Sequence, residues 1–180
     1  MAVLDTALGA ALLTRDDFAD WAGTRSGWNG ITLVRAALPL SREWVRSPQE
    51  TRLRLMVELG LGLGGLLVNH TVVGTATPGP GEVDLFDEEA GMVLEFDGAD
   101  HRSPAQHRHD LAKEDAATDL SLVLARFTSA DLRRPELVRH RVVSTRSRAA
   151  FLSEDERPWA VRPPGTRHNR VLGARLRAIR

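Results

Sequence analysis

The chain has 180 residues, of which 42% are hydrophobic, and its 24 basic and 24 acidic side chains give zero formal net charge. This length can bury one sizeable core and is too short for two large independent domains. Cysteine is absent, which excludes disulfides, thiolate metal sites and thiol nucleophiles. The first residues lack the basic segment of a signal peptide, and the most apolar stretch contains four glycines. We therefore expect a cytoplasmic protein with no membrane partner, and the oligomeric state stays open.

The N-terminal quarter, residues 1–46, predicts a helical support region. Thr14 stands three residues ahead of Asp17, the pattern of a helix N-cap followed by an acidic first turn. A stronger helix start follows at residues 47–50, where a capping serine, a proline at the first helical position and a glutamate that closes a capping box occur together. We place the start of the core domain, residues 47–149, at this helix.

The core domain predicts an α/β fold in the order helix, three strands, helix, strand. The strands are expected from residue 66, at 82–86, at 92–97 and at 122–127, and helices at 103–120 and at 135–151. Strands 82–86 and 92–97 lie close enough in the chain to form a hairpin with its loop at 88–91. The remainder, residues 150–180, has no convincing periodicity and is expected to be a basic C-terminal extension.

Two carboxylates are predicted to meet on this hairpin. A loop at 88–91 sets Asp84 directly opposite Glu95, with their Cβ atoms about 5 Å apart. Alternation along the strand puts Asp97 on the same face as Glu95. Adjacent carboxylates repel unless a cation compensates them, and Mg²⁺ prefers such oxygen ligands. The pattern predicts a Mg²⁺ site, with Mn²⁺ as a substitute; the alternative is that arginines pair with both carboxylates.

These residues also carry a resemblance to a known family. Val83-Asp84-Leu85, then Val93-Leu94-Glu95-Phe96-Asp97-Gly98 and His101 resemble restriction-endonuclease-like proteins of the PD-(D/E)XK type that are related to very-short-patch-repair endonucleases. Ser47-Pro48-x-Glu50-x-Arg52-Leu53-Arg54, Asp110 and Thr128-x-x-Asp131-Leu132 are similar to actinobacterial AbiEi-type antitoxin or endonuclease-domain proteins. The similarity covers most of residues 1–149. It implies a restriction-endonuclease-like core, a mixed sheet flanked by helices, that hydrolyses DNA phosphodiesters with Mg²⁺.

The resemblance also implies roles for single residues. Asp84 and Glu95 become metal ligands, the Phe96 carbonyl a further ligand, and Glu50 a carboxylate carried by a helix near the metal. Asp97 is a further candidate ligand, although an Asp-Gly pair equally suits a turn in which the carboxylate caps the backbone. The capping box equally explains Glu50 without any catalysis.

The chain departs from the family pattern in one respect. Asp97 stands where the motif has a lysine, so a cation that stabilises the transition state is missing from its usual place. Lys113, the only lysine of the chain, is a candidate substitute on the following helix, and His101 is a second one. The alternative for Lys113 is an ordinary surface lysine. The alternative for His101, and for His107 and His109 after it, is that they are solvated side chains.

Arginines provide the expected DNA contacts. Arg133, Arg134 and Arg139 are predicted to bind the DNA backbone without reading bases. Residues 157–180 hold seven arginines and no carboxylate, which suits contact with phosphates or a solvated tail. The predicted activity is that of a Mg²⁺-dependent DNA endonuclease. The alternatives are a nuclease fold without catalysis, acting as a DNA-binding or antitoxin-like module, and a protein-interaction domain with no nucleic-acid role.

Overall fold

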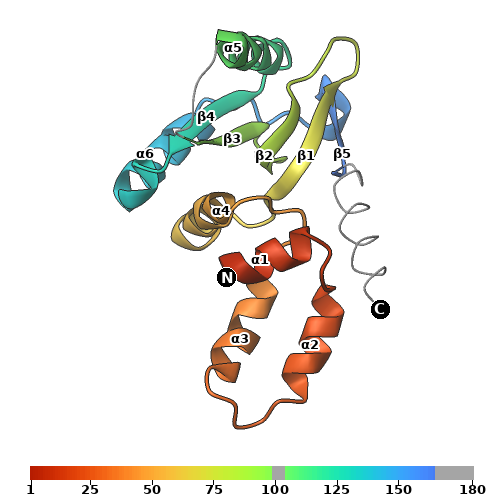
Figure 1. Cartoon of the computed structure of the whole chain (residues 1–180). Coiled ribbons are helices and arrows are strands. Elements are labelled where there is room, and N and C mark those ends of the chain that lie inside the picture. The colour runs from red at the N-terminus through yellow and green to blue at the C-terminus, as the bar shows by residue number, and fades with distance from the viewer. Residues whose placement is uncertain (99–103, 165–180) are drawn as a thin grey trace. The chain divides into compact units, whose positions relative to one another are not determined.

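The computed structural model describes residues 1–98 and 104–164 (Figure 1). The described chain forms two compact units, Met1–Thr51 and Arg52–Pro164. Within these two ranges, no helix combines the length and the apolarity needed to cross a bilayer.

The first unit is helical, as predicted. Its helices are α1 (Ala2–Gly9), α2 (Arg15–Gly23) and α3 (Ile31–Ala37), followed by the 3-10 turn η1 (Leu38–Leu40). The Thr14 hydroxyl accepts a hydrogen bond of 3.0 Å from the Asp17 N–H, which confirms the predicted N-cap of α2. Asp5 is fully buried and accepts hydrogen bonds of 2.9 Å from the Arg42 N–H and the Thr51 hydroxyl. These bonds satisfy a buried carboxylate that joins distant parts of the unit.

Helix α4 (Pro48–Leu61) begins where the capping pattern predicts. The Glu50 N–H donates to the Ser47 hydroxyl at 3.2 Å, and the Glu50 carboxylate accepts the Arg46 N–H at 3.0 Å. The first bond satisfies a backbone donor that the first helical turn leaves without an internal partner, and the second holds the residue before Ser47 against the start of the helix.

The second unit is built on a five-stranded mixed sheet, with the strand order β4-β3-β2-β1-β5. The strands are β1 (Leu67–Gly74), β2 (Gly81–Asp87), β3 (Met92–Asp97), β4 (Val123–Thr128) and β5 (Trp159–Arg162). Strands β1, β2 and β3 are antiparallel neighbours, and β4 runs parallel to β3. A parallel neighbour requires a crossover, and α5 (Pro104–Asp119) supplies it. The predicted order of helix, three strands, helix and strand is therefore confirmed.

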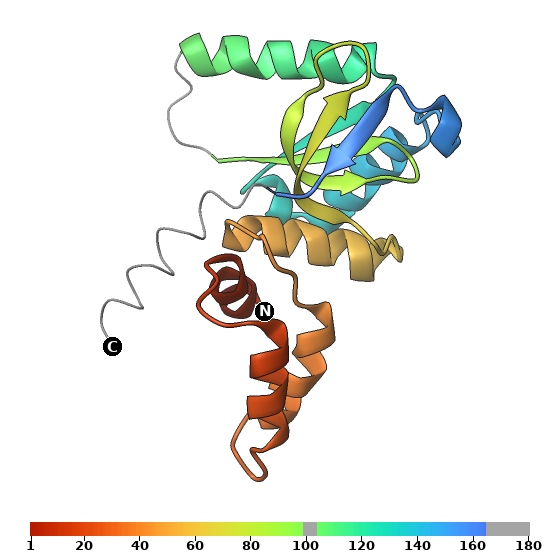
Figure 2. The same cartoon turned by 90° about the vertical axis from the view of Figure 1, so that its right-hand side faces the viewer.

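Helices cover both faces of this sheet (Figure 2). Helix α5 lies on one face, and α6 (Pro135–Arg146), which follows the 3-10 turn η2 (Asp131–Arg133), lies on the other. The core on the sheet includes the buried side chains of Val72, Val83, Phe86, Val93, Ala117, Leu120, Leu122 and Trp159. Burying both faces explains why β3 starts with three consecutive buried apolar residues, Met92 to Leu94.

Two features differ from the sequence predictions. Strand β5 lies within residues 150–180, which were predicted as an extension, and pairs antiparallel with β1. Its Trp159 is buried and meets Phe86 edge-on, with ring centroids 5.1 Å apart. A strand of four residues is too short to produce a recognisable alternation. Helix α6 ends at Arg146, before the predicted residue 151, and Phe151 adopts a positive φ of 50° that no right-handed helix contains.

Candidate active site

The hairpin of β2 and β3 sets the two predicted carboxylates side by side. Leu85 pairs with Leu94 and Phe86 with Val93, and continuing this register by one residue sets Asp84 opposite Glu95. This is the register that a loop at 88–91 predicts. Gly91 closes that loop at a φ of 66°, a conformation that glycine adopts without steric cost. The Asp84 carboxylate accepts a hydrogen bond of 2.7 Å from the Phe96 N–H, which fixes it against β3.

Lys113 of α5 points at this pair and is not an ordinary surface lysine. Its ammonium lies 2.7 Å from Glu95 Oε1 and donates a hydrogen bond of 2.6 Å to the Glu82 carbonyl. The two side chains are only 13% and 15% exposed, respectively, so the ion pair is largely shielded from water. Glu95 therefore pairs directly with a lysine, and an arginine, Arg126, is a further cation near it.

The ion pair does not cancel the cost of burying Glu95. Its Oε1 is buried and lies 2.7 Å from the Lys113 ammonium. Burial raises the pKa of Glu95 above its usual value, and attraction to Lys113 and to Arg126 offsets only part of this effect. A further positive charge near Glu95 would favour its ionised form.

Arg126 is a part of the site that sequence reasoning missed. It lies on β4 next to Glu95 in the parallel register. Its guanidinium donates to the Glu114 carboxylate at 3.1 Å and to the Asp110 carbonyl at 3.0 Å, which holds it against α5. The sequence did indicate that β4 follows a crossover helix, which would place β4 parallel to β3 and one of its residues beside Glu95. Identifying that residue as Arg126 requires knowing where β4 begins, and element boundaries are the least certain part of a sequence prediction.

The other predicted metal ligands lie in different parts of the chain. Asp97 ends β3, pairs with Thr128 in the register and is half-buried; Phe96 contributes its N–H to Asp84. Glu50 belongs to the first unit, where it caps α4. His101 lies outside the described residues. Within residues 1–98 and 104–164, no three carboxylate or imidazole side chains gather closely enough to hold a metal by themselves.

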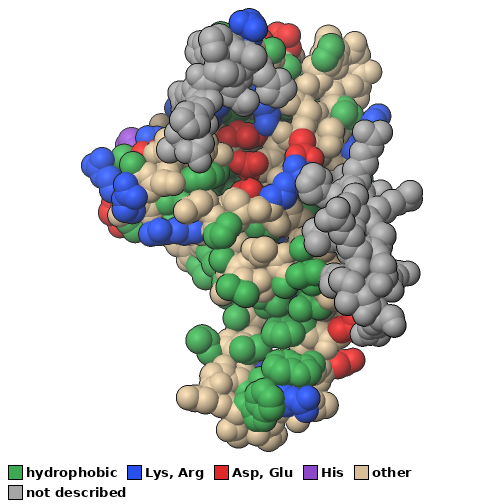
Figure 3. Space-filling model, in the orientation of Figure 1, with side chains coloured by type: hydrophobic (Ala, Val, Ile, Leu, Met, Phe, Trp, Pro, Cys, Tyr) green, Lys and Arg blue, Asp and Glu red, His purple; other side chains and the backbone are tan. Residues whose placement is uncertain are grey.

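The predicted DNA-binding arginines follow β4. Arg133 and Arg134 lie at the end of η2, the turn that follows β4, and are exposed, as is Arg139 on α6. Because β3 and β4 are parallel and Asp97 pairs with Thr128, Arg133 and Arg134 leave the sheet at the end where β3 carries its carboxylates. Figure 3 shows acidic side chains over the sheet, with Lys and Arg side chains beside them and further basic side chains over α6.

Asp131 fixes the turn that carries these arginines. Its carboxylate accepts hydrogen bonds from the Thr128 N–H at 2.9 Å and hydroxyl at 3.0 Å, and it pairs with Arg141 at 3.1 Å. The Thr128 N–H, followed by the other polar partners, holds the pKa of Asp131 below its usual value. The Thr128-x-x-Asp131 motif therefore has a structural explanation, because it links the end of β4 to α6.

Comparison with models of known protein families, with curated proteins and with solved structures finds no match in any of the three. Any assignment of an activity therefore depends on the geometry of Asp84, Glu95 and Lys113.

Proposed function

We propose that this chain is a metal-dependent endodeoxyribonuclease that uses Mg²⁺ or Mn²⁺ to hydrolyse DNA phosphodiesters. The observation that carries the proposal is the Lys113 ammonium 2.7 Å from Glu95, on a hairpin whose register continues to Asp84 opposite Glu95. Two carboxylates and a lysine are the side chains that the PD-(D/E)XK resemblance implies. The resemblance also implies a mixed sheet flanked by helices, and the second unit has such a sheet (Figure 2).

The chemistry of the donors fits a hard divalent cation. Mg²⁺ in phosphoryl-transfer sites is usually held by one or two carboxylates, with waters and substrate oxygens completing its shell. Asp84 and Glu95 supply two carboxylates, so a third acidic side chain is not required. The raised pKa of Glu95 points the same way, because a buried carboxylate that is only partly compensated gains from a nearby cation.

Each residue then has a defined task. The metal, when bound, polarises the phosphate and lowers the pKa of the attacking water. The Phe96 N–H holds Asp84 in place, and Glu95 must be ionised to act as a ligand. Lys113 takes the part of the missing motif lysine: its ammonium offsets the negative charge that develops on the phosphate during attack. Arg133 and Arg134 bind the DNA backbone at the same end of the sheet.

Nicking of supercoiled plasmid tests the proposal. Nicking is expected with Mg²⁺ or Mn²⁺, and EDTA should abolish it. Asp84→Asn should remove activity, and Lys113→Met should lower it about a hundredfold, the usual loss for one transition-state donor. Asp119→Asn, at the exposed end of α5, is the matched control. Unchanged nicking by a folded Asp84→Asn variant would show that the activity lies elsewhere.

One observation favours a second candidate, a nuclease fold that binds DNA without cleaving it. Asp97 occupies the motif position of the lysine, and Lys113 is already engaged by Glu95 and the Glu82 carbonyl. This candidate predicts that the protein retains DNA at low salt and never nicks it with either metal. A protein-interaction domain would retain no DNA even at low salt.

A further inference from the structure

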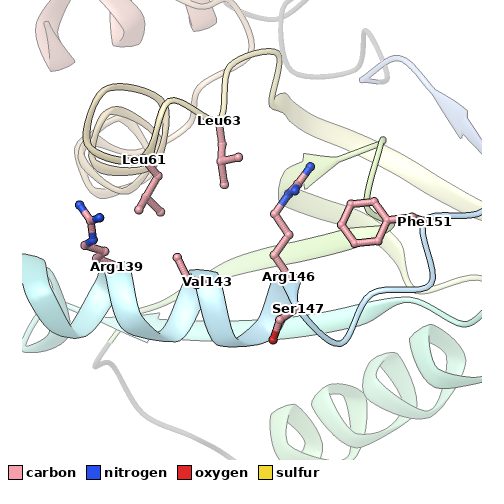
Figure 4. A pocket seen from close by; sticks show the side chains of 7 residues that line it. All are labelled: Leu61, Leu63, Arg139, Val143, Arg146, Ser147 and Phe151. Carbon is pink, nitrogen blue, oxygen red and sulfur yellow. The ribbon is translucent and has the colours of Figure 1, made fainter.

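Helix α6 borders a groove on the sheet face opposite α5. The groove has a volume of about 400 Å³. In Figure 4, Leu61 and Leu63 reach toward α6 from the end of α4, and Phe151 stands beside Arg146 at the far end. The lining side chains are Leu61, Leu63, Arg139, Val143, Arg146, Ser147 and Phe151. The groove thus combines an apolar floor with hydroxyl and guanidinium groups.

A second hollow continues this groove along α6. It has a volume of about 550 Å³ and is lined by Glu136, Arg139, His140, Val143, Ser144 and Ser147. Arg139, Val143 and Ser147 line both hollows. The joined surface, here called the α6 groove, runs from Glu136 to Ser147, which is about 17 Å at the helical rise per residue. Such a length suits an extended polymer of a few residues better than a compact small molecule.

Phe151 gives the α6 groove a flat aromatic wall. Its side chain is 45% exposed, although its backbone has a φ of 50°, which costs free energy for any residue other than glycine. The Arg146 guanidinium stacks on the ring, 4.8 Å from its centroid. Strain that positions an exposed aromatic ring gives no stability to a core, and strain of this kind is concentrated at ligand sites.

Exposed arginines at the α6 groove favour an anionic ligand. Arg139 lines both hollows, and the exposed Arg148 donates a hydrogen bond of 3.3 Å to the Ser144 hydroxyl, which lines the second hollow. Glu136 is the carboxylate of the lining. Arg146 is paired with two carboxylates, Asp87 at 2.9 Å and Glu89 at 2.5 Å, so it adds no net positive charge to the groove. It therefore serves as a support for Phe151, and the exposed arginines provide the net charge. A basic peptide, such as the Arg-rich segment 165–180 of this chain, would be repelled.

From these observations we propose that the α6 groove binds single-stranded nucleic acid, with an unpaired base stacked on Phe151 and backbone phosphates on Arg139 and its neighbours. Sequence-tolerant binding of single strands combines a basic groove with aromatic stacking in this way. Bases within a duplex have their faces covered by their neighbours and would not reach Phe151. The inference rests on the proposed function only in taking nucleic acid as the partner.

Fluorescence anisotropy with three labelled probes tests the inference: an oligo-dT strand, an abasic strand of equal length and a duplex. The full chain should bind oligo-dT about tenfold more tightly than the abasic strand, which is the typical effect of one stacked base. Phe151→Ala should remove this preference and leave the abasic affinity unchanged. Arg139→Ala should weaken binding of both strands equally. Leu59→Ala, an exposed apolar side chain of α4 outside the α6 groove, should change neither.

A second variant separates folding from binding at the same position. Phe151→Gly relieves the positive φ, so it should unfold at the same temperature as the unmodified chain or higher, and yet lose the preference for oligo-dT. Equal affinity for oligo-dT and abasic strands, tighter binding of the duplex, or no binding of any nucleic acid would overturn the inference. The last result would also leave an acidic apolar peptide as the better occupant.

The nicking assay distinguishes failure of this inference from failure of the proposed nuclease. Asp84→Asn should keep the full preference for oligo-dT, because Asp84 lies on β2 and lines neither hollow. Loss of nicking with intact binding to the α6 groove would remove only the nuclease proposal. Nicking without a preference for oligo-dT would remove only the inference about the α6 groove.

Discussion

The Lys113–Glu95 ion pair leads to a prediction at the scale of single residues. Both side chains are largely buried, and a buried charge left without its partner is costly. Lys113→Met should therefore lower the free energy of unfolding by about 2–3 kcal/mol. Adding Glu95→Gln should restore part of this loss, because the double variant leaves no buried charge uncompensated. Urea denaturation of the two single variants and the double variant measures the coupling.

The pH dependence of the same variants gives the control. Burial already raises the pKa of Glu95, so the folded chain binds a proton there more readily than the unfolded chain, and stability falls as pH rises through the raised pKa. Without Lys113 the free energy of unfolding should fall further with rising pH. The loss of unfolding free energy caused by Lys113→Met should thus be smaller in acid. A loss that is the same at all pH values would show that Lys113 acts through packing alone.

Asp131 leads to the opposite pH dependence. The Thr128 N–H and the other partners lower its pKa, so its contribution to stability is present above about pH 4 and is lost as pH falls through the lowered value. Asp131→Ala should lower the free energy of unfolding by about 1–3 kcal/mol at neutral pH, because it removes hydrogen bonds to a charged group. Asp119→Ala serves as the exposed control. If the difference between Asp131→Ala and the unmodified chain persisted in acid, the effect would not come from the ionised carboxylate.

At the scale of elements, the start of α4 separates capping from catalysis. The Glu50 carboxylate accepts the Arg46 N–H, and glutamine satisfies a capping box as glutamate does. Glu50→Gln should therefore preserve the melting temperature, whereas Ser47→Ala should lower the free energy of unfolding by about 1 kcal/mol. If the Gln variant also nicks plasmid normally, Glu50 is a cap only. A stable Glu50→Gln variant with greatly reduced nicking would support the catalytic role that the resemblance implies.

The elements that the sequence predicted well are those with local signals. Thr14 and Ser47 are capping residues that act within one helical turn, and the hairpin register follows from a four-residue loop. Strand β5 was missed because it has four residues and owes its place to a distant partner, β1. Arg126 and the stacking of Arg146 on Phe151 were missed for the same reason: each depends on how a crossover or a chain end packs, and no short pattern encodes that.

At the scale of the whole molecule, the net charge is zero, but basic and acidic side chains are concentrated on different elements, and this distribution affects how the chain binds a polyanion. The exposed arginines from 133 to 148 lie on helix α6, in the turn before it and just after its end, while Asp84, Glu95 and Asp97 occupy two neighbouring strands. A neutral molecule gains little long-range attraction to DNA. Binding should therefore depend on contacts within a Debye length, about 10 Å at 0.1 M salt, and the local arginines should determine the salt dependence.

Binding of a divalent cation should stabilise the whole fold, because a ligand that binds only the folded state shifts the unfolding equilibrium. At a Mg²⁺ concentration ten times its dissociation constant the gain is about 1.4 kcal/mol, which corresponds to a rise of roughly 3–6 °C in the melting temperature of a chain of this size. Differential scanning calorimetry, compared with NaCl at equal ionic strength, measures it. Asp84→Asn should abolish the rise, and Glu88→Gln, on the exposed hairpin turn, should keep it.

The same stabilisation should depend on pH with a defined sign. The pKa of Glu95 is raised by burial, so at low pH a proton occupies the carboxylate and competes with the cation. The rise in melting temperature caused by Mg²⁺ should therefore be small in acid and grow as pH increases through the raised pKa of Glu95. In Glu95→Gln no such growth is expected, because the amide does not titrate. A rise that is independent of pH, or equal in Asp84→Asn and the unmodified chain, would place the cation away from the hairpin and remove the physical basis of the proposed nuclease.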